Sequence, residues 1–307
     1  MPEHLRALVV ILFLAFFVFY MVQNAATTFI SRDNFTRWRN LWFSLTLVAF
    51  LAHNYWIYAF IGSMIIYYAL KREQHPAALF LFLLFVIPSA NADIPGFGII
   101  NFLFTLTHTR ILALVILLPT FLVLIREEET TPFGQTWPDK LFAGYLLVSM
   151  ALLLRPPPPP DAWSFTNMGR QYFYLFIDVF LPYYVISRSV RSLEQFKVVL
   201  LGFVMATMLM AIIAVFEFAR HWQLYHALVN ALGAEWGFQG YLGRVGMLRS
   251  TVTTGQAIAL GFTMAVSIGF YLFLQHYGSK RHAEIIDGTK VTFTTHVFSR
   301  AAGALLL

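Results

Sequence analysis

VVLLGFVMATMLMAIIAVFEF, residues Val198–Phe218, decides the fold class of this chain. The stretch has no charged residue before Glu217. A helix needs roughly 20 apolar residues to cross the hydrocarbon core of a bilayer, so this run predicts a transmembrane helix. Ala7–Val22 and Gln256–Gln275 are two more runs of this kind. The chain is therefore predicted to be an α-helical membrane protein.

Further apolar runs predict additional membrane segments. The shorter ones are Ala77–Ser89, Ile111–Ile125, Leu141–Leu154, Gln171–Ser187 and the final run Phe293–Leu307.

Two regions leave alternatives open. Leu41–Leu70 is apolar but interrupted at His53 and Asn54, which predicts one long tilted helix or a tight hairpin. Ile99–Thr107 predicts an extension of the helix from Ile111, or a segment along the membrane interface. Residues 1–307 are thus expected to form one all-α domain, a polytopic transmembrane helical bundle of about 8–10 membrane segments.

Composition supports the membrane class and excludes several others. Of the 307 residues, 59% are hydrophobic and 12% are charged, whereas soluble domains carry about 25% charged residues. The chain has no cysteine, which excludes disulfides, thiolate catalysis and cysteine-ligated metal. The net charge of +6 comes from basic residues in short loops between apolar runs, where they act as topology signals and contacts for membrane lipids. We therefore expect no nucleic-acid partner.

The same basic residues predict an orientation, because cytoplasmic loops are rich in Lys and Arg. Lys71-Arg72 and the group Arg188, Arg191 and Lys197 place their loops in the cytoplasm. Counting spans then puts 126–140 and 276–292 inside, and 89–98, 155–170 and 219–255 outside. Ala7–Val22 is expected to be a retained first span and not a cleaved signal peptide, because no clear small-residue cleavage site follows it.

The longest loop, 219–255, is the most informative one. It opens with an amphipathic stretch from His221 to Leu232, in which Trp222 and Tyr225 suit the headgroup level. A glycine-rich return follows, and glycine lets the backbone approach a ligand closely. The basic residues of this loop are Arg220, Arg244 and Arg249.

An ordered set of motifs resembles a known family. Arg191–Phe196 (RSLEQF) precedes a long helix that ends in Phe216-Glu217-Phe218. After it come the external amphipathic stretch, then Gly243-Arg244-Val245-Gly246, and then a new span at Gly255-Gln256. This order resembles the O-antigen ligase and O-antigen polymerase superfamily. The opening MPEHLRAL and Asn40–Ser44 (NLWFS) resemble a branch found with exosortase systems, the putative O-glycosylation ligases.

The resemblance implies a GT-C-like fold and a metal-independent glycan transfer that needs no cofactor. It implies a donor, an undecaprenyl-diphosphate-linked glycan, and an acceptor that is lipid A-core, a glycan or a protein hydroxyl. The reaction would occur on the periplasmic face of the bacterial inner membrane. The family's later loop and its His-Asn-type motif are missing, and Ser299-Arg300-Ala301 resembles a relic of its Ser-Arg-Gly helix. The chain is therefore expected to be a truncated member.

The resemblance also suggests which residues act. Two external arginines of the family match Arg170 and Arg244, which are expected to be catalytic by gripping the diphosphate. Arginine suits that role because it is permanently charged and binds phosphate with two donors. The expected substrate-binding residues are Arg249, Arg220, Glu217 and Arg110.

Each of these residues also has a simpler interpretation. The arginines can anchor helix ends in lipid headgroups, and Glu217 can orient Arg220 or Arg244. Asp178, in the middle of Gln171–Ser187, is either catalytic or an ion-pair partner for an arginine.

His221 and His226 are weaker candidates for a base. His276, His282 and His296 lack metal-ligand spacing, so no metal site is expected. Competing functions are a transporter or flippase of lipid-linked sugars, and a non-catalytic membrane assembly partner.

Overall fold

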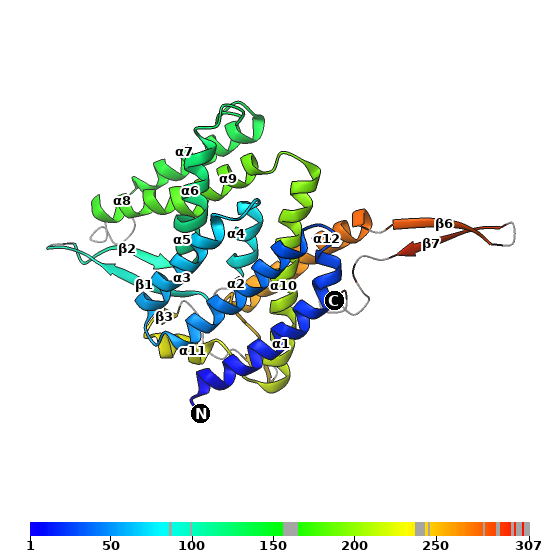
Figure 1. Ribbon diagram of the computed structural model, residues 1–307. Helices are drawn as coiled ribbons and strands as arrows, with labels where there is room; N and C mark the ends of the chain where they lie inside the picture. The colour runs from blue at the N-terminus through cyan, green and yellow to red at the C-terminus, as the bar shows by residue number, and fades with distance from the viewer. Residues whose placement is uncertain are drawn as a thin grey trace.

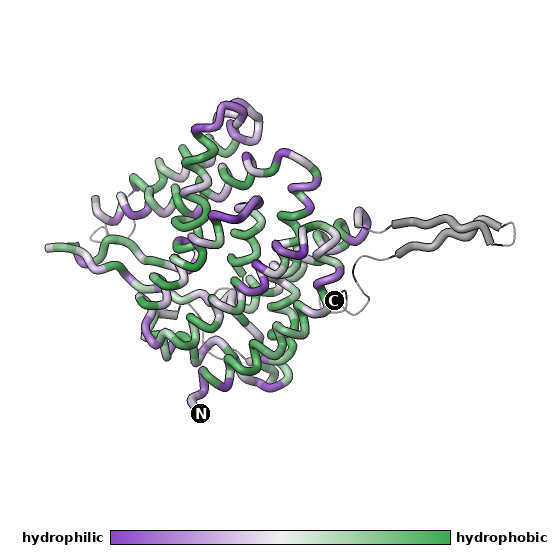
Figure 2. The backbone as a smooth tube through the Cα atoms, in the orientation of Figure 1, coloured by the Kyte–Doolittle hydropathy of each residue, from purple (hydrophilic) through white to green (hydrophobic). Residues whose placement is uncertain are grey.

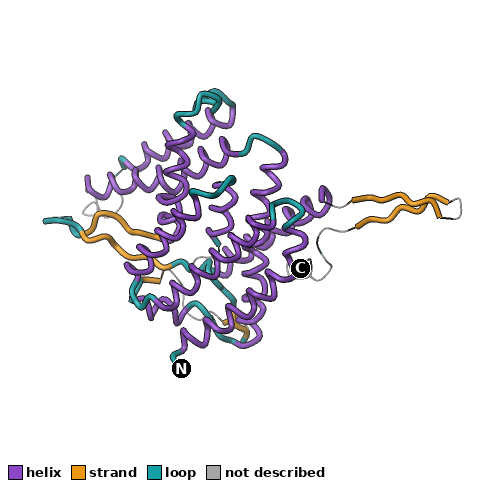
Figure 3. The backbone as a smooth tube through the Cα atoms, viewed as in Figure 1, coloured by secondary structure: helices purple, strands orange, loops and turns teal. Residues whose placement is uncertain are grey.

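The computed structural model describes residues 1–85, 88–98, 100–155, 165–236, 243–244, 246–278, 280–286 and 289–295, together with residues 298 and 303. The described chain is predominantly helical, with a few short sheets (Figures 1 and 3). Hydrophobic residues predominate in the helices, and hydrophilic residues gather in the loops that connect them (Figure 2). Ser299-Arg300-Ala301, which resembles a family motif, lies outside the described residues.

The helices follow the predicted apolar runs closely. Their bounds are α1 Glu3–Ala26, α2 Arg32–Leu51, α3 Tyr55–Leu70, α4 Pro76–Leu84, α5 His108–Leu112, η1 Ala113–Leu117, α6 Leu118–Leu124, α7 Trp137–Leu153, α8 Phe165–Tyr174, η3 Leu175–Phe180, α9 Leu181–Ser189, α10 Leu193–Arg220, α11 His226–Leu232 and α12 Ala257–Gly278.

Three helices of the described chain, α1, α10 and α12, are long and apolar enough to cross a membrane. These correspond to the three clearest predicted runs. Shorter apolar helices occupy Tyr55–Leu70 and His108–Leu124. The membrane class thus rests on helix length and hydropathy at three independent places in the sequence.

The apolar region Leu41–Leu70 forms a hairpin, which is the second of the two predicted alternatives. His53 adopts a left-handed backbone (φ 51°) between α2 and α3. The side chain of Asn54 then accepts a hydrogen bond from the amide of Trp56 (2.9 Å) and caps α3. An asparagine cap replaces the missing hydrogen-bond partners at a helix start, so this pair of polar residues ends one helix and begins the next.

Helix α10 is the centre of the bundle, with α1, α4 and α12 packed around it (Figure 1). Gly202 lies so close to α4 that a Cβ there would be 2.6 Å from the carbonyl oxygen of Ala78. Thr207 of α10 and Ser267 of α12, both buried, share a hydrogen bond. Small residues allow this close approach, and paired hydroxyls satisfy each other, as is typical of packed membrane helices.

Two helices are interrupted in the same way. Residues 108–124 and 165–189 each contain a π-helical turn, η1 and η3, followed by a Leu-Pro pair, Leu118-Pro119 and Leu181-Pro182. Proline lacks an amide proton and its ring clashes with the carbonyl four residues earlier. The wider π turn relieves that clash, so both helices continue past the proline. These two helices pack against each other through α6 and α9.

The chain also forms strands where none was predicted. The prediction that Ile99–Thr107 extends a helix is wrong, because β2 (Phe102–Thr107) pairs antiparallel with β1 (Ala90–Pro95), and β3 (Glu235–Trp236) pairs with β1 on the other side. Pairing with β1 supplies partners for backbone groups that a single strand beside apolar surface would leave unsatisfied.

Two more antiparallel pairs complete the sheets. β4 (Gly243–Arg244) pairs with β5 (Met247–Leu248). β6 (Lys280–Ile286) pairs with β7 (Thr289–Thr295), where a solvated loop and the start of a last apolar run were expected.

The loops gather at two ends of the bundle. At one, the glycine-loop end (residues 1–4, 52–54, 88–98, 100–107, 219–236, 243–244 and 246–255), Trp222 Nε1 donates to Glu3 Oε1 (2.9 Å) and Ala90 pairs with Trp236. At the other, the basic end (residues 27–40, 71–75, 125–140 and 188–192), Arg191 Nη2 donates to Glu127 (2.5 Å). Segment 89–98 therefore contacts 219–255, and 126–140 contacts the loop of Arg191; the charge pattern assigned the members of each pair to one side.

Candidate functional site

A cavity of about 450 Å³ opens between β2 and α8 and includes Arg170. Its walls are mostly apolar; among the lining residues are Ile100, Leu103, Phe104 and Phe173. The guanidinium of Arg170 lies over the ring of Phe102, 3.8 Å from the centroid, and its Nε donates to the carbonyl of Thr166 (3.4 Å). No carboxylate of the described chain lies within ion-pair distance of Arg170. Its charge is therefore balanced by no acidic residue there.

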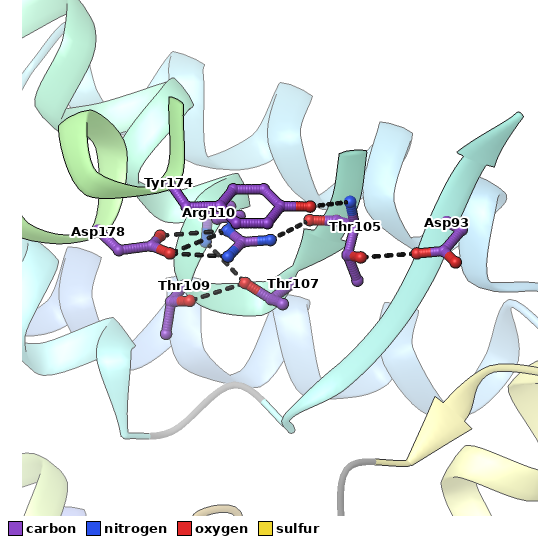
Figure 4. A network of polar contacts seen from close by, with 7 residues as sticks. All are labelled: Asp93, Thr105, Thr107, Thr109, Arg110, Tyr174 and Asp178. Atoms are coloured by element: carbon purple, nitrogen blue, oxygen red, sulfur yellow. Dashed lines mark hydrogen bonds and ion pairs between the residues drawn. The ribbon is translucent and has the colours of Figure 1, made fainter. Parts of the chain in front are cut away.

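Arg110 lies nearby in a network that joins β2 to the helix η3 (Figure 4). Its Nε and Nη2 donate to both oxygens of Asp178 at 2.8–3.2 Å, and its Nη1 donates to the carbonyl of Thr105 (2.6 Å). The guanidinium also stacks on Tyr174, 3.3 Å from the ring centroid. Of the two predicted roles of Asp178, the ion pair with an arginine is the one its contacts show.

The same network holds the walls of the Arg170 cavity together. The hydroxyl of Tyr174, on α8, accepts a hydrogen bond from the amide of Thr105, on β2 (2.8 Å). The hydroxyl of Thr105 donates to Asp93 of β1 (2.7 Å), and Thr107 caps α5 by accepting from the amide of Arg110 (3.3 Å). Sequence reasoning missed Tyr174, Thr105 and Asp93, because their roles depend on contacts between distant segments (Figure 4).

Glu217 is fully buried and braces the glycine-loop end. Its carboxylate accepts hydrogen bonds from three backbone amides, those of Leu224 (3.0 Å), Thr251 (3.2 Å) and Val252 (3.1 Å). Val252 has a positive φ of 48°, which is strained for a β-branched residue. Among the described contacts, Glu217 therefore holds backbone, and not Arg220, which is one of the two arginines that the sequence suggested.

The amphipathic stretch of this loop is shorter than predicted, because His221 takes a left-handed conformation (φ 51°) that ends α10, and α11 begins only at His226. The side chain of Tyr225 points into the protein. It is buried against Phe50, with ring centroids 6.1 Å apart, and burial raises the pKa of its hydroxyl.

The remaining predicted residues are dispersed over this end. Arg220 ends α10, and Arg249 follows β5; neither pairs with a carboxylate in the described part of the chain. The backbone of Arg244 lies in β4, and its side chain is outside the described residues. The convergence of Arg170 and Arg244 on one ligand stays a prediction. Within the described ranges, no cluster of three His, Asp or Glu residues suitable for a metal ion occurs.

The basic end holds a second polar centre that the sequence did not predict. Asp139, with no exposed surface, accepts from Nη2 of Arg188 (2.5 Å) and from the hydroxyl of Tyr183 (2.9 Å). The hydrogen bond from Arg188 holds the pKa of the Asp139 carboxyl well below its usual range. This pair ties α7 to α9.

The geometry at the Arg170 cavity is suited to an amphiphile: apolar walls for a hydrocarbon chain and a cation for an anionic head. A scan of the chain against protein-family models found no match, and searches of curated proteins and of solved structures also found none.

Proposed function

We propose that this protein transfers a glycan from an undecaprenyl-diphosphate carrier to an acceptor hydroxyl of lipid A-core, a glycan or a protein. The proposal places the transfer at the glycine-loop end of a polytopic, GT-C-like bundle, on the periplasmic face of a bacterial inner membrane. It rests on one observation above all: Arg170, free of carboxylate partners in the described chain, borders an apolar cavity of about 450 Å³.

The chemistry of the reaction matches that arrangement. Breaking the bond between sugar and diphosphate builds negative charge on the leaving diphosphate. A fixed guanidinium stabilises that charge, and it does so more strongly beside apolar walls than in water. Arg244 is the proposed second cation, with Arg220 and Arg249 at the same loop end.

Arg110 has a different part in this proposal. Its guanidinium is already bound by Asp178, by the carbonyl of Thr105 and by the ring of Tyr174. It therefore keeps β2 and α8 at the spacing that forms the cavity, and it does not need to contact the diphosphate. Glu217 plays a similar positioning part for the loop 219–255 through its three amide contacts.

The test uses purified protein in liposomes with an undecaprenyl-diphosphate glycan and an acceptor. Arg170→Ala is expected to lower kcat/KM by a factor of about 100–1000, as for loss of one charge-stabilising donor. Arg155→Ala is the matched control, because Arg155 is exposed and begins the predicted external segment 155–170 that Arg170 ends. Equal activity of Arg170→Ala and the wild type would show that the diphosphate is recognised elsewhere.

One observation favours a transporter as second candidate. The two helices with π turns and Leu-Pro pairs lie together, and the Arg110–Asp178 ion pair joins the first of them to η3 of the second. Interrupted helices with an ion pair occur along substrate paths in transporters. Movement of a lipid-linked glycan across vesicles without an acceptor, lost in Asp178→Asn, would support this candidate over the transferase.

A further inference from the structure

A cavity of about 530 Å³ at the basic end lies between the start of α2, the end of α3 and α4. We call it the α2–α3 pocket. Arg37, Lys71 and Arg72 supply three cationic groups to its lining. Trp38, Leu41 and Leu79 form an apolar floor and are almost fully buried. The pocket is far in the fold from the Arg170 cavity, which belongs to the glycine-loop end.

The positive charge of the pocket is only partly offset from within. Its single lining carboxylate, Glu73, is occupied: Oε2 accepts from Trp38 Nε1 (2.8 Å), and Oε1 accepts from the amides of Gln74 and His75 (both 3.0 Å). Within the described ranges, neither Arg37, Lys71 nor Arg72 has a carboxylate within ion-pair distance. Three cations and one carboxylate leave the lining with a net charge of +2, which attracts an anion.

Two of the three cations, Arg37 and Lys71, are held in place by the surrounding structure. Arg37 Nη1 donates to the backbone carbonyl of Arg72 (2.5 Å), while its buried Nε has no partner. Lys71 Nζ lies 4.7 Å from the ring centroid of Tyr67 and 5.5 Å from that of Tyr68. Cation–π contacts of this kind fix the ammonium beside the pocket without removing its charge.

An apolar surface leads into the pocket from the side. On α3, exposed apolar side chains recur at helical spacing at Ile57, Phe60, Ile61 and Met64, and the row ends at Tyr68 on the rim of the pocket. A row of this kind on a helix of a membrane protein faces lipid chains. The ligand that fits both features has an anionic head and hydrocarbon tails, and a soluble phosphate uses only the first.

We infer that the α2–α3 pocket binds the headgroup of an anionic phospholipid, with its phosphate on Lys71 and Arg72 and its acyl chains along α3. Tyrosines at the interface and lysine and arginine beside it are the usual elements of such recognition. This site is independent of the proposed glycan transfer and lies at the opposite end of the bundle.

The test titrates purified full-length protein in neutral detergent micelles with phosphatidylglycerol that carries a fluorescent acyl chain. We expect one saturable site. Lys71→Gln/Arg72→Gln should weaken binding roughly thirtyfold, since each cation near an anionic lipid contributes about 1 kcal/mol and 1.4 kcal/mol is tenfold. Both side chains are exposed, so the variant should fold, which an unchanged unfolding midpoint will show.

The matched control is Arg32→Gln/Lys140→Gln, which removes two exposed cations at the basic end that do not line the pocket. It should weaken binding by less than about threefold, as expected for screened surface charges. Three results would overturn the inference: equal weakening in the two variants, equally tight binding of phosphatidylcholine, or competition by soluble glycerol phosphate as strong as by the lipid. The last result would identify a site for free phosphate.

Discussion

The Asp139–Arg188 pair provides a sharp test of how burial determines the value of an ion pair. Two pairs at the basic end have the same N–O separation of 2.5 Å, Arg188–Asp139 and Arg191–Glu127. The side chains of the first are 6% and 0% exposed, and those of the second are 39% and 41% exposed. The two ion pairs therefore have the same N–O distance and differ in their exposure to water.

Asp139→Asn keeps the size of the side chain and leaves the buried guanidinium of Arg188 without its counter-charge. Breaking a buried pair on one side costs about 3–5 kcal/mol. The pair lies at the end of the bundle, close to water, so we expect the low end, about 3 kcal/mol, or roughly a hundredfold in the folding equilibrium. Glu127→Gln is the matched control and should have a far smaller effect, because water screens that pair.

The assay is reversible unfolding of the purified protein in mixed micelles, with the free energy of unfolding measured for each variant. Asp139→Asn/Arg188→Met should recover most of the loss, because the penalty comes from the unpaired charge and not from lost packing. Equal losses in Asp139→Asn and Glu127→Gln would refute the argument from burial. A double variant no more stable than Asp139→Asn would refute the argument from the orphaned charge.

The pH dependence of the same pair has a definite sign. The pKa of Asp139 is lower in the folded chain than the ordinary carboxyl value of about 4, chiefly through the hydrogen bond from Arg188. Its contribution to stability is therefore fully present above that ordinary value and is lost as the pH falls toward the folded pKa. The gap between wild type and Asp139→Asn should narrow below about pH 4, by at most about 1.4 kcal/mol per pH unit. A gap that stays constant down to pH 3 would contradict this.

Three further changes test the helix packing and the glycine-loop end. Gly202→Ala should destabilise the folded protein by about 1–3 kcal/mol, because the added Cβ would lie 2.6 Å from a backbone carbonyl oxygen of α4. Gly269→Ala on α12 is the control. It places a Cβ in open space and should not destabilise the protein in the same unfolding assay. Glu217→Gln should lower the free energy of unfolding by about 2 kcal/mol, since the NH2 group of glutamine cannot accept hydrogen bonds from backbone amides. It should also speed limited proteolysis of residues 219–255. Unchanged cleavage would argue against a role of Glu217 in holding this loop. Tyr174→Phe keeps the ring beneath the arginine but leaves the amide of Thr105 unpaired, so a loss of about 1 kcal/mol is expected, and no loss would show that water replaces the hydroxyl.

The sequence by itself determined the membrane class and most helix positions. Val198–Phe218 predicts a spanning helix whatever surrounds it, because the free energy of placing apolar residues in lipid adds up along the segment. The sequence also marks an interruption at His53 and Asn54, but it leaves a long tilted helix and a hairpin both open. The glycan-transfer interpretation came from the order of motifs and stays a proposal.

Only the tertiary structure decided which polar groups meet. It made Leu41–Leu70 a hairpin, turned 102–107 into a strand, paired Arg110 with Asp178 and gave Glu217 three backbone amides as partners. A charged side chain in an apolar bundle must find a partner, but the partner comes from whichever segment packs against it. That choice depends on contacts between residues far apart in the chain, which hydropathy and local propensity do not encode.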